Sequence, residues 1–251
     1  MPDDDAAYQI VDGSSDRLII AFNARVSKRF GFYKILSERP ETKLFVRDQS
    51  NQWYNAGCGE LGADVASITE GLKRLIEPVD PREIVTLGSS MGGYAAILFG
   101  TLLGATRVIA FAPQTWIDAM FALSPPASTV REVADLTDAV EAAPATAVEI
   151  LVGPDSVVDL YQAVRLAHLP SVRVYEVADH AHGILSGMQQ DGTLKESLSE
   201  LMDKGIWSER EFNVRPQDDI GIIEDIVISS HRDDHAGAAE RAESLCRKYP
   251  A

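Results

Sequence analysis

The chain has 251 residues and a mass of 27.3 kDa, the size of one ordinary domain or of one domain with an extension. Hydrophobic residues make up 45% and charged residues 24%, which is typical of a soluble globular protein and excludes a disordered chain. Lys and Arg number 23 against 38 Asp and Glu, so the net charge of −15 argues against a general nucleic-acid binder or a protein of anionic membranes, both of which need a basic field.

Cysteine use and the N-terminal residues indicate a cytoplasmic protein. Cys58 and Cys246 lie far apart in the sequence, which gives no disulfide framework and no zinc ligand set. Residues 1–5 are acidic and polar, unlike the basic start and apolar run of a signal peptide. The apolar tract from Tyr94 to Ala112 is interrupted by glycine and polar residues, so we interpret it as a buried helix followed by a buried strand. We therefore expect no membrane contact.

Short apolar runs alternate with helical patterns along most of the chain. Strands are predicted at 18–22, 43–47, 84–87, 107–111, 148–152 and 172–177, with 8–11 as a hairpin partner of the first across the Asp12-Gly13 turn. Helices are predicted at 31–38, 61–76, 94–103, 160–169 and 184–202. Because the strand runs are apolar on both faces, the order predicts an α/β fold, a mostly parallel sheet flanked by helices.

Two segments depart from this alternation. The pattern loosens between 114 and 147, where there are prolines at 125, 126 and 144. Residues 205–251 predict two helices, at 222–228 and 236–246, although a strand is an alternative for the first. The second helix resembles half of a helical repeat, but a terminal helical pair docked on the domain is the simpler interpretation.

One motif indicates chemistry. The segment Gly88-Ser89-Ser90-Met91-Gly92-Gly93 matches G-x-S-x-G, follows the apolar strand at 84–87 and opens an alanine-rich helix at Tyr94. This strand–turn–helix setting suits a nucleophilic serine, because the serine needs a strained backbone position and its glycine neighbours tolerate close packing. The free N–H groups of the helix N-terminus also favour developing negative charge.

The segment Gly88 to Ala96, with the strand order around it, resembles the nucleophile elbow of the α/β-hydrolases, and the resemblance extends from residue 8 to about residue 204. In that family the catalytic triad runs Ser, then Asp or Glu, then His along the chain. The resemblance implies Ser90 as nucleophile, whereas its rival Ser89 fills the first x position and would point away from the exposed corner. It implies His182 as base, since His182 precedes a glycine and opens the final helix. His180, closer to the last strand, is the alternative.

The remaining catalytic groups follow from position in the same fold. The acid should follow the penultimate strand, where Asp155 lies nearest the strand end and is preferred. Asp159 is the alternative, and its other role would be to cap the next helix. The oxyanion hole requires two backbone N–H groups, which the resemblance assigns to Met91 and to Ala24, although the His-Gly-Gly sequence of many lipases and esterases is absent there.

Three side chains are candidates for substrate binding. Arg25 lies on the loop after the first parallel strand, together with Lys28 and Arg29, where it would anchor an anionic group or simply be solvated. Trp53 and Tyr54 follow the second parallel strand on the same side of the sheet. They would line a pocket or pack beneath the nearby glycine-rich turn.

The family often inserts a cap where residues 114–147 lie, so we expect a hydrolase domain over 1–204 with a small cap at 114–147. Residues 205–251 would be a C-terminal helical extension, open to a protein partner or a second copy. The resemblance implies a serine hydrolase that cleaves an acyl bond, ester rather than amide, in a small-molecule or acylated substrate, without cofactor or metal. Thioesterases, peptidases and acyltransferases share these residues, and a non-catalytic interaction module with this fold is the alternative outside enzymes.

Overall fold

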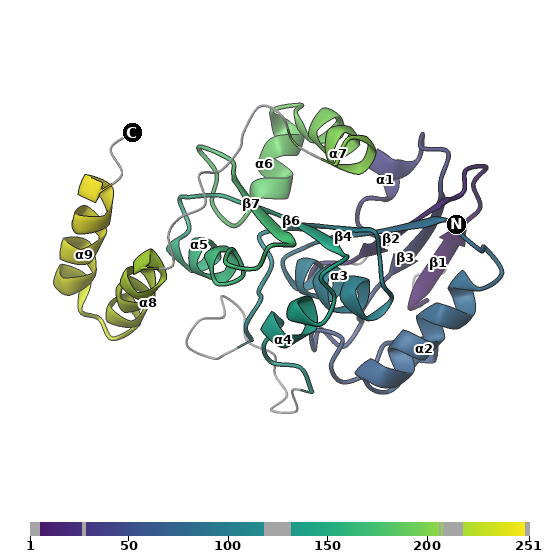
Figure 1. The fold of residues 1–251 in the computed structure, drawn as a ribbon, viewed down its shortest axis with the longest axis horizontal. Helices are drawn as coiled ribbons and strands as arrows, with labels where there is room; N and C mark the ends of the chain where they lie inside the picture. Colours follow the sequence, from purple (N-terminus) through teal and green to yellow (C-terminus); the bar gives the residue numbers. More distant parts are fainter. Residues whose placement is uncertain (1–5, 27–28, 118–131, 206, 208–217, 249–251) are drawn as a thin grey trace.

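The computed structural model describes residues 6–26, 29–117, 132–205, 207 and 218–248 (Figure 1). This part of the chain contains a seven-stranded sheet with the order β1-β3-β2-β4-β5-β6-β7. Every neighbouring pair is parallel except β1 with β3. The strands are β1 (Tyr8–Val11), β2 (Arg17–Phe22), β3 (Thr42–Val46), β4 (Glu83–Ser89), β5 (Arg107–Phe111), β6 (Ala147–Val152) and β7 (Val172–Glu176).

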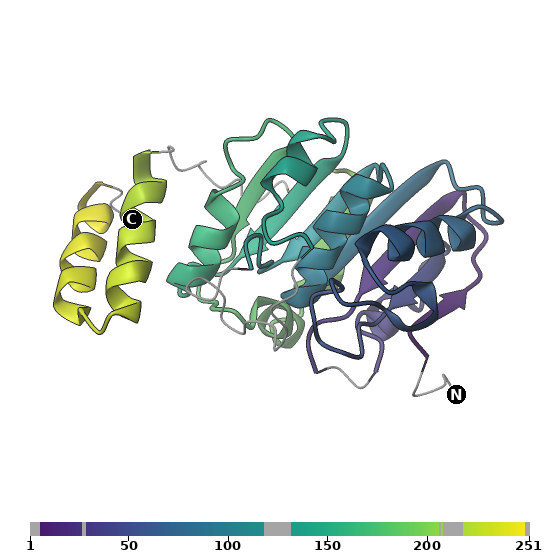
Figure 2. The same cartoon turned by 90° about the horizontal axis from the view of Figure 1, so that it is seen from below.

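Helices cover both faces of the sheet, which confirms the predicted α/β class (Figures 1 and 2). One face carries α2 (Val65–Ile76), α3 (Met91–Leu102), α4 (Thr137–Glu141) and α5 (Val157–Val164). The other carries α1 (Tyr33–Leu36), α6 (Ile184–Gln190) and α7 (Leu194–Asp203). A 3-10 turn at Gly59–Leu61 precedes α2.

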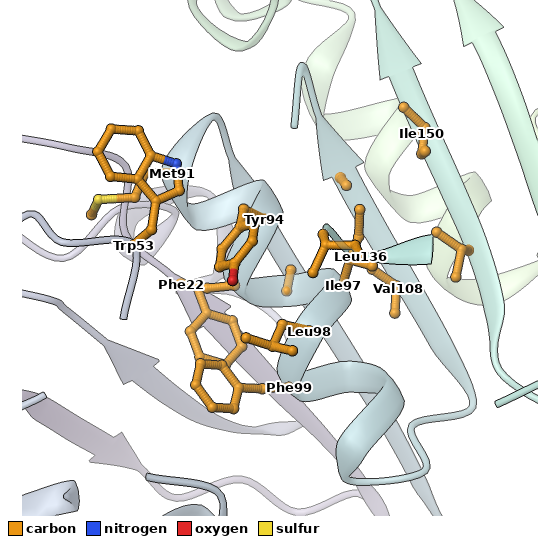
Figure 3. Close-up of a cluster of buried hydrophobic side chains, with 14 of the residues drawn as sticks. Phe22, Trp53, Met91, Tyr94, Ile97, Leu98, Phe99, Val108, Leu136 and Ile150 are labelled. Carbon is orange, nitrogen blue, oxygen red and sulfur yellow. The ribbon is translucent and has the colours of Figure 1, made fainter. Parts of the chain in front are cut away.

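Strand β2 explains why the sequence runs are apolar at every position. Leu18, Ile20 and Phe22 belong to the buried cluster beneath α2 and α3, whereas Ile19 and Ala21 belong to the cluster beneath α6 and α7. Successive side chains of a strand point to opposite faces, so a strand covered on both sides must be apolar throughout. Figure 3 shows this packing on the α3 side, where Phe22 stacks on Phe99 with 5.5 Å between ring centroids.

The structure corrects two predicted elements. Residues 8–11 form a strand, but it pairs with β3 rather than with β2, with Tyr8 opposite Val46. Both edges of β2 are already occupied, by β3 and β4, so β1 takes the free edge of β3. The helix predicted at 184–202 is two helices, α6 and α7, because Gly192 adopts a positive φ of 76° between them.

Residues 218–248 form a helical hairpin of α8 (Asp218–His231) and α9 (His235–Lys248), which lie side by side in both views (Figures 1 and 2). Helix α8 packs on α5, and its Ile223, Ile226 and Val227 are buried in the cluster that contains Leu160 and Tyr161 of α5. The segment at 222–228 is therefore helical. No helix within the described ranges is long and apolar enough to cross a membrane.

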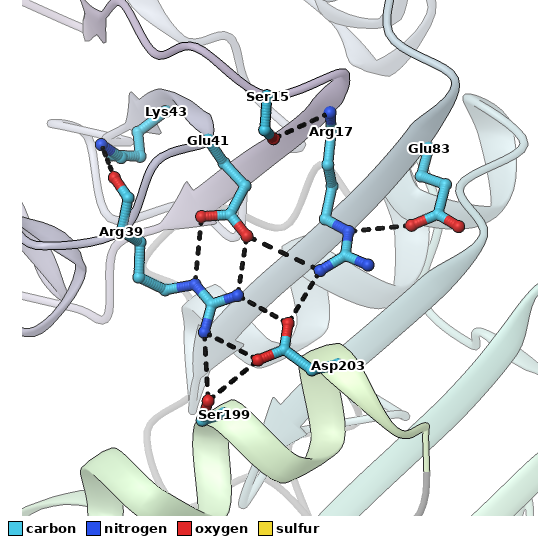
Figure 4. Close-up of polar contacts among 8 residues, drawn as sticks. All are labelled: Ser15, Arg17, Arg39, Glu41, Lys43, Glu83, Ser199 and Asp203. Atoms are coloured by element: carbon cyan, nitrogen blue, oxygen red, sulfur yellow. Dashed lines mark hydrogen bonds and ion pairs between the residues drawn. The ribbon is translucent and has the colours of Figure 1, made fainter.

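An ionic cluster ties the end of α7 to the sheet (Figure 4). The carboxylate of Asp203, the last residue of α7, accepts hydrogen bonds from Arg39 at 2.7 Å and from Arg17 at 2.9 Å. Arg39 also pairs with Glu41 at 2.7 Å, and the Glu41 side chain is only 4% exposed. Hydrogen bonds from Arg39 hold the pKa of Asp203 at about 2, against the smaller opposing effect of burial. The ionised form of Asp203 is thus the one that the fold stabilises.

Replacing Asp203 by alanine is expected to lower the free energy of unfolding by about 1 kcal/mol at pH 7, since a partly exposed carboxylate in an ionic network contributes on that order. The pKa of Asp203 is lower in the folded chain, so its contribution is present above the ordinary carboxyl pKa and is lost as pH falls toward about 2. Urea unfolding at pH 7 and at pH 3 measures both effects. Glu196→Ala, an exposed position on the same helix, is the matched control. Equal losses in the two variants would contradict this role of the cluster.

Candidate active site

Ser90 occupies a strained turn between β4 and α3. Its backbone has φ 53° and ψ −118°, a conformation that non-glycine residues rarely adopt. A Cβ atom at Gly88 would overlap the carbonyl of Gly92, and one at Gly92 would overlap the carbonyl oxygen of Phe22. The Ser90 N–H donates to the carbonyl of Phe111 on β5 at 2.9 Å, which fixes the turn to the sheet. Gly88 and Gly92 must be glycine because neighbouring backbone atoms approach them closely. The turn places Ser90 where a pocket opens.

A chain of hydrogen bonds runs from Ser90 through His182 to Asp159. The Nε2 of His182 lies 3.0 Å from the Oγ of Ser90. Its Nδ1 lies 2.9 Å from Oδ1 and 3.1 Å from Oδ2 of Asp159. Because a carboxylate only accepts, Nδ1 carries the proton and Nε2 is left to accept from the serine hydroxyl. Ser90 and His182, the preferred residues of the sequence analysis, are brought together here, but their acidic partner differs from the preferred one.

The preferred acid, Asp155, does not reach His182. Its side chain is exposed, and its backbone N–H donates to the carbonyl of His180 at 3.1 Å. The predicted start of the helix at residue 160 is also late: α5 begins at 157, and Ser156 is its N-cap, accepting from the N–H of Asp159 at 3.3 Å. Asp159 therefore falls within the first turn rather than at the cap. There its side chain is fully buried, with 0% exposure, and points to His182.

The rival base, His180, faces α6. Its Nδ1 lies 2.7 Å from the carbonyl oxygen of Ala178, and its Nε2 lies 3.2 Å from a carboxylate oxygen of Asp191. The ring rests on Gly187, where a Cβ atom would overlap it. These contacts hold the loop that follows β7, so His180 fixes the position of the segment that carries His182.

Met91 and Ala24 lie where two oxyanion donors are expected. Met91 is the first residue of α3, and Ala24 follows the end of β2 and lines the same cleft as Ser90. The close approach of Gly92 to the Phe22–Asn23 backbone brings the two segments together. Within the described residues, neither the Met91 N–H nor the Ala24 N–H donates a hydrogen bond. Both donors are therefore available to a developing oxyanion.

Comparisons with known proteins find likeness in structure alone. No protein-family model and no curated protein matches the chain. The capsule O-acetyltransferase of Neisseria meningitidis serogroup A is similar at a TM-score of 0.59 and 16% identity, with 75% of this chain and 90% of that chain covered. MenH from S. aureus gives 0.59 at 12% identity, with 80% and 99% covered. A thermophilic esterase from Thermogutta terrifontis gives 0.54 at 17% identity, with 79% and 93% covered.

The chain has the α/β-hydrolase fold. This confirms the resemblance drawn from the elbow motif and the strand order. Two of these similar structures are an O-acetyltransferase and an esterase, but at identities of 12–17% the likeness establishes the fold alone.

In this α/β-hydrolase fold a cleft of about 430 Å³ opens over the elbow. Its lining residues are Ala24, Arg25, Val26, Trp53, Ser89, Ser90, His182, Gly183, Leu185 and Ser186. Two of the three predicted substrate-binding residues, Arg25 and Trp53, thus lie at the cleft. Tyr54 does not. It is buried in the core, with its hydroxyl 3.2 Å from the carbonyl oxygen of Asn23.

Sequence reasoning missed the polar side chains that hold the loop at 23–31. Asn23 is buried, and its Oδ1 accepts from the Gly31 N–H at 2.6 Å while its Nδ2 donates to the Arg29 carbonyl at 2.8 Å. With Tyr54 beneath it, Asn23 fixes the backbone that leads into Ala24. A single asparagine after a strand gives no motif, so no sequence signal identifies it.

Some predicted features fall outside the described residues. These are Lys28 and residues 118–131 of the expected cap at 114–147. Asn55 links the Trp53 loop to α3 and, in the described part of that segment, to Val133: its Nδ2 lies 2.9 Å from the Tyr94 hydroxyl, and its Oδ1 accepts from the Val133 N–H at 2.8 Å. Among the described residues no three His, Cys, Asp or Glu side chains are placed to hold a metal ion.

The Asp159 carboxylate controls the protonation of His182. By accepting the Nδ1–H it raises the pKa of His182 above the ordinary value of 6.5, and partial burial opposes this effect without reversing it. A general base must be neutral, so the raised pKa sets the lower pH limit of a reaction that uses His182.

We expect kcat/KM for an ester to fall as pH decreases through a midpoint above 6.5, the ordinary imidazole value. In Asp159→Asn the carboxylate no longer stabilises imidazolium, so the residual activity should titrate at a lower pH. A pH profile of kcat/KM on both proteins measures the two midpoints. An acid limb that stays at the same pH in Asp159→Asn would mean that His182 is not the group that titrates.

Proposed function

We propose that this protein is a serine-dependent hydrolase that cleaves an acyl ester through an acyl-enzyme. The observation that carries the proposal is the hydrogen-bonded chain from Ser90 through His182 to buried Asp159, with Ser90 held at a strained elbow beside two free N–H donors. Nucleophile, base and orienting acid in this order are the requirements of nucleophilic acyl transfer. The fold agrees with this chemistry but does not specify it.

Acylation begins when the Oγ of Ser90 attacks the ester carbonyl while the Nε2 of His182 takes its proton. The carbonyl oxygen becomes an oxyanion, which the N–H groups of Met91 and Ala24 stabilise by hydrogen bonds formed most strongly at that stage. Asp159 holds the imidazole in the productive tautomer and stabilises imidazolium. The C–O bond to the leaving alcohol then breaks, and His182 gives its proton to the departing oxygen.

Deacylation repeats the sequence with water as nucleophile. His182 takes a proton from the water that attacks the acyl-Ser90 carbonyl, and the same two N–H groups stabilise the second oxyanion. Collapse releases the carboxylic acid and returns the proton to Ser90. The balance is one ester and one water consumed, one acid and one alcohol formed.

Acyl transfer to an alcohol is the second candidate, and the similarity to a capsule O-acetyltransferase favours it. The chemistry differs only in the group that attacks the acyl-enzyme, which would be a hydroxyl of an acceptor instead of water. His182 is 38% exposed on the cleft, so a second substrate can approach it.

Stopped-flow hydrolysis of p-nitrophenyl acetate tests the proposal. We expect a burst of p-nitrophenolate equal to the enzyme concentration, followed by slower turnover, because the acyl-enzyme accumulates. Adding glycerol as acceptor separates the two candidates: a hydrolase forms acetate at an unchanged rate, whereas an acyltransferase forms acetylglycerol and turns over faster. A folded protein that shows neither burst nor turnover with any ester of a chain-length series would contradict the proposal.

The proposed catalytic groups all lie within residues 1–204. We therefore propose that residues 205–251 serve docking or interaction, with a partner protein or a second copy, rather than chemistry. A cytoplasmic location remains our proposal from composition.

A further inference from the structure

Arg25 is a cation at the rim of the catalytic cleft and has no carboxylate partner among the residues that the structure describes. Its side chain is exposed and lines the cleft with Ser90 and His182. Its one contact in the described residues is with the ring of Trp53, whose centroid lies 6.0 Å from the guanidinium carbon. Several other arginines of this acidic protein pair with carboxylates, as Arg39 and Arg165 do. The free charge of Arg25 is therefore available to a ligand.

The described lining of the cleft supplies no anion to neutralise this charge. None of its lining residues is Asp or Glu, and Arg25 carries its one permanent charge. The Asp159 carboxylate of the site is fully buried and hydrogen-bonded to His182. The whole chain has a net charge of −15, so an uncompensated cation in the catalytic cleft marks the place where a negative group is accepted.

The platform beneath Arg25 is rigid. Trp53 is 1% exposed and adopts a positive φ of 55°, which the surrounding loop must enforce. The Asp48 carboxylate enforces it by accepting backbone N–H groups of Gln52 at 2.7 Å and of Tyr54 at 2.9 Å. The cation–π contact with this ring, at 6.0 Å, leaves the N–H groups of Arg25 free for the two oxygens of an oxyanion.

A direct hydrogen bond couples this platform to the loop of Arg25. The backbone N–H of Val26 donates to the Oδ1 of Asn51 at 2.7 Å, which links the loop after β2 to the loop after β3. The same loop after β2 carries Ala24. Ala24, the proposed oxyanion donor, directly precedes Arg25 on this segment, so the distance between the Ala24 N–H and the Arg25 backbone is fixed.

We propose that Arg25, which lies over the ring of Trp53, is an oxyanion-recognition site, and that the substrate is an ester that carries a carboxylate or phosphate group besides the reacting carbonyl. This inference rests on the proposed function and adds the substrate class. The anion binds the guanidinium by charge-assisted hydrogen bonds while the carbonyl lies at Ser90. A cleft of about 430 Å³ has room for a small acyl group together with such an anion.

The kinetic test uses a matched pair of substrates: 4-nitrophenyl hydrogen glutarate, which is anionic, and its neutral methyl ester. We expect the wild type to have the higher kcat/KM for the anionic ester. In Arg25→Gln the anionic-to-neutral ratio should fall about 10- to 100-fold, the value of a charge-assisted hydrogen bond. Arg29→Gln removes the same charge from an exposed position of the same loop outside the cleft lining, and its ratio should equal that of the wild type. Equal ratios in all three proteins, or a wild type that prefers the neutral ester, would overturn the inference.

A binding test keeps the inference separate from catalysis. Titration calorimetry with glutarate and with phenyl phosphate should show binding that Arg25→Gln weakens at least tenfold and that Arg29→Gln leaves unchanged. The anion that binds more tightly shows whether the site prefers a carboxylate or a phosphate. If these anions bind through Arg25 but no ester is hydrolysed, the proposed function fails and the anion site stands. If esters are hydrolysed but neither anion binds differently to Arg25→Gln, the function stands and the anion site is wrong.

Discussion

Ser90→Ala is expected to lower turnover of an ester by a factor on the order of 10³ or more, because the Oγ that forms the acyl bond is lost while the oxyanion donors remain. The fold should persist, since a hydroxyl is removed from a turn that backbone contacts hold: the Ser90 N–H still donates to Phe111 and its carbonyl still accepts from Tyr94. The measurement is steady-state hydrolysis of p-nitrophenyl acetate, with circular dichroism and the melting temperature to confirm folding.

Ser89→Ala is the matched control for this prediction. Ser89 is the last residue of β4, also lines the cleft, and differs from Ser90 in having no hydrogen bond to His182. We expect it to keep most of the activity. Loss of activity in Ser89→Ala with retention in Ser90→Ala would show that the nucleophile is Ser89 and not Ser90.

Asp159→Asn is expected to reduce turnover by about 10³- to 10⁴-fold with little change in stability. Asparagine has nearly the shape of aspartate, so the buried site stays filled. Its amide, however, can donate toward Nδ1 and thereby favour the tautomer in which Nε2 carries the proton and cannot accept from Ser90. The rate effect therefore arises from orientation and charge at His182, not from unfolding. Ester hydrolysis and thermal melting on the same preparation separate the two causes.

Asp155→Asn supplies the control, since Asp155 is exposed and touches the loop of His180 through its backbone alone among the contacts described. The same chemical change there should leave turnover within a few-fold of wild type. The reverse result, an inactive Asp155→Asn beside an active Asp159→Asn, would require a rearrangement of the segment at 153–159 when substrate binds.

The strands of the fold were predictable because burial on both faces demands unbroken apolar runs, and their mostly parallel arrangement was predictable from the alternation with helices. The pairing of β1 was not, because the Asp12-Gly13 turn indicates a reversal without indicating which strand edge is free. Likewise the periodicity at 184–202 continues through Gly192, and only the positive φ of that glycine divides α6 from α7.

At the site, Ser90 and His182 were predictable because each is tied to a strand end that the sequence marks clearly. Asp159 was misplaced because the start of α5 was predicted three residues late. Once Ser156 caps the helix, the first turn carries Asp159 inward, whereas Asp155 stays in the exposed loop. Asn23 and His180 hold their loops through hydrogen bonds to backbone groups, and such contacts leave no pattern in the sequence.

Covalent labelling with a fluorophosphonate, followed by peptide mapping with mass spectrometry, tests the central claim most directly. The reagent reacts with a serine that an adjacent base activates, so it reports on the nucleophile without knowledge of the natural substrate. The arrangement of Ser90, His182 and Asp159 predicts a single adduct on the Oγ of Ser90, formed more slowly at low pH as His182 becomes protonated. An adduct on Ser89 or on another hydroxyl, or a folded protein that does not react at all, would contradict it.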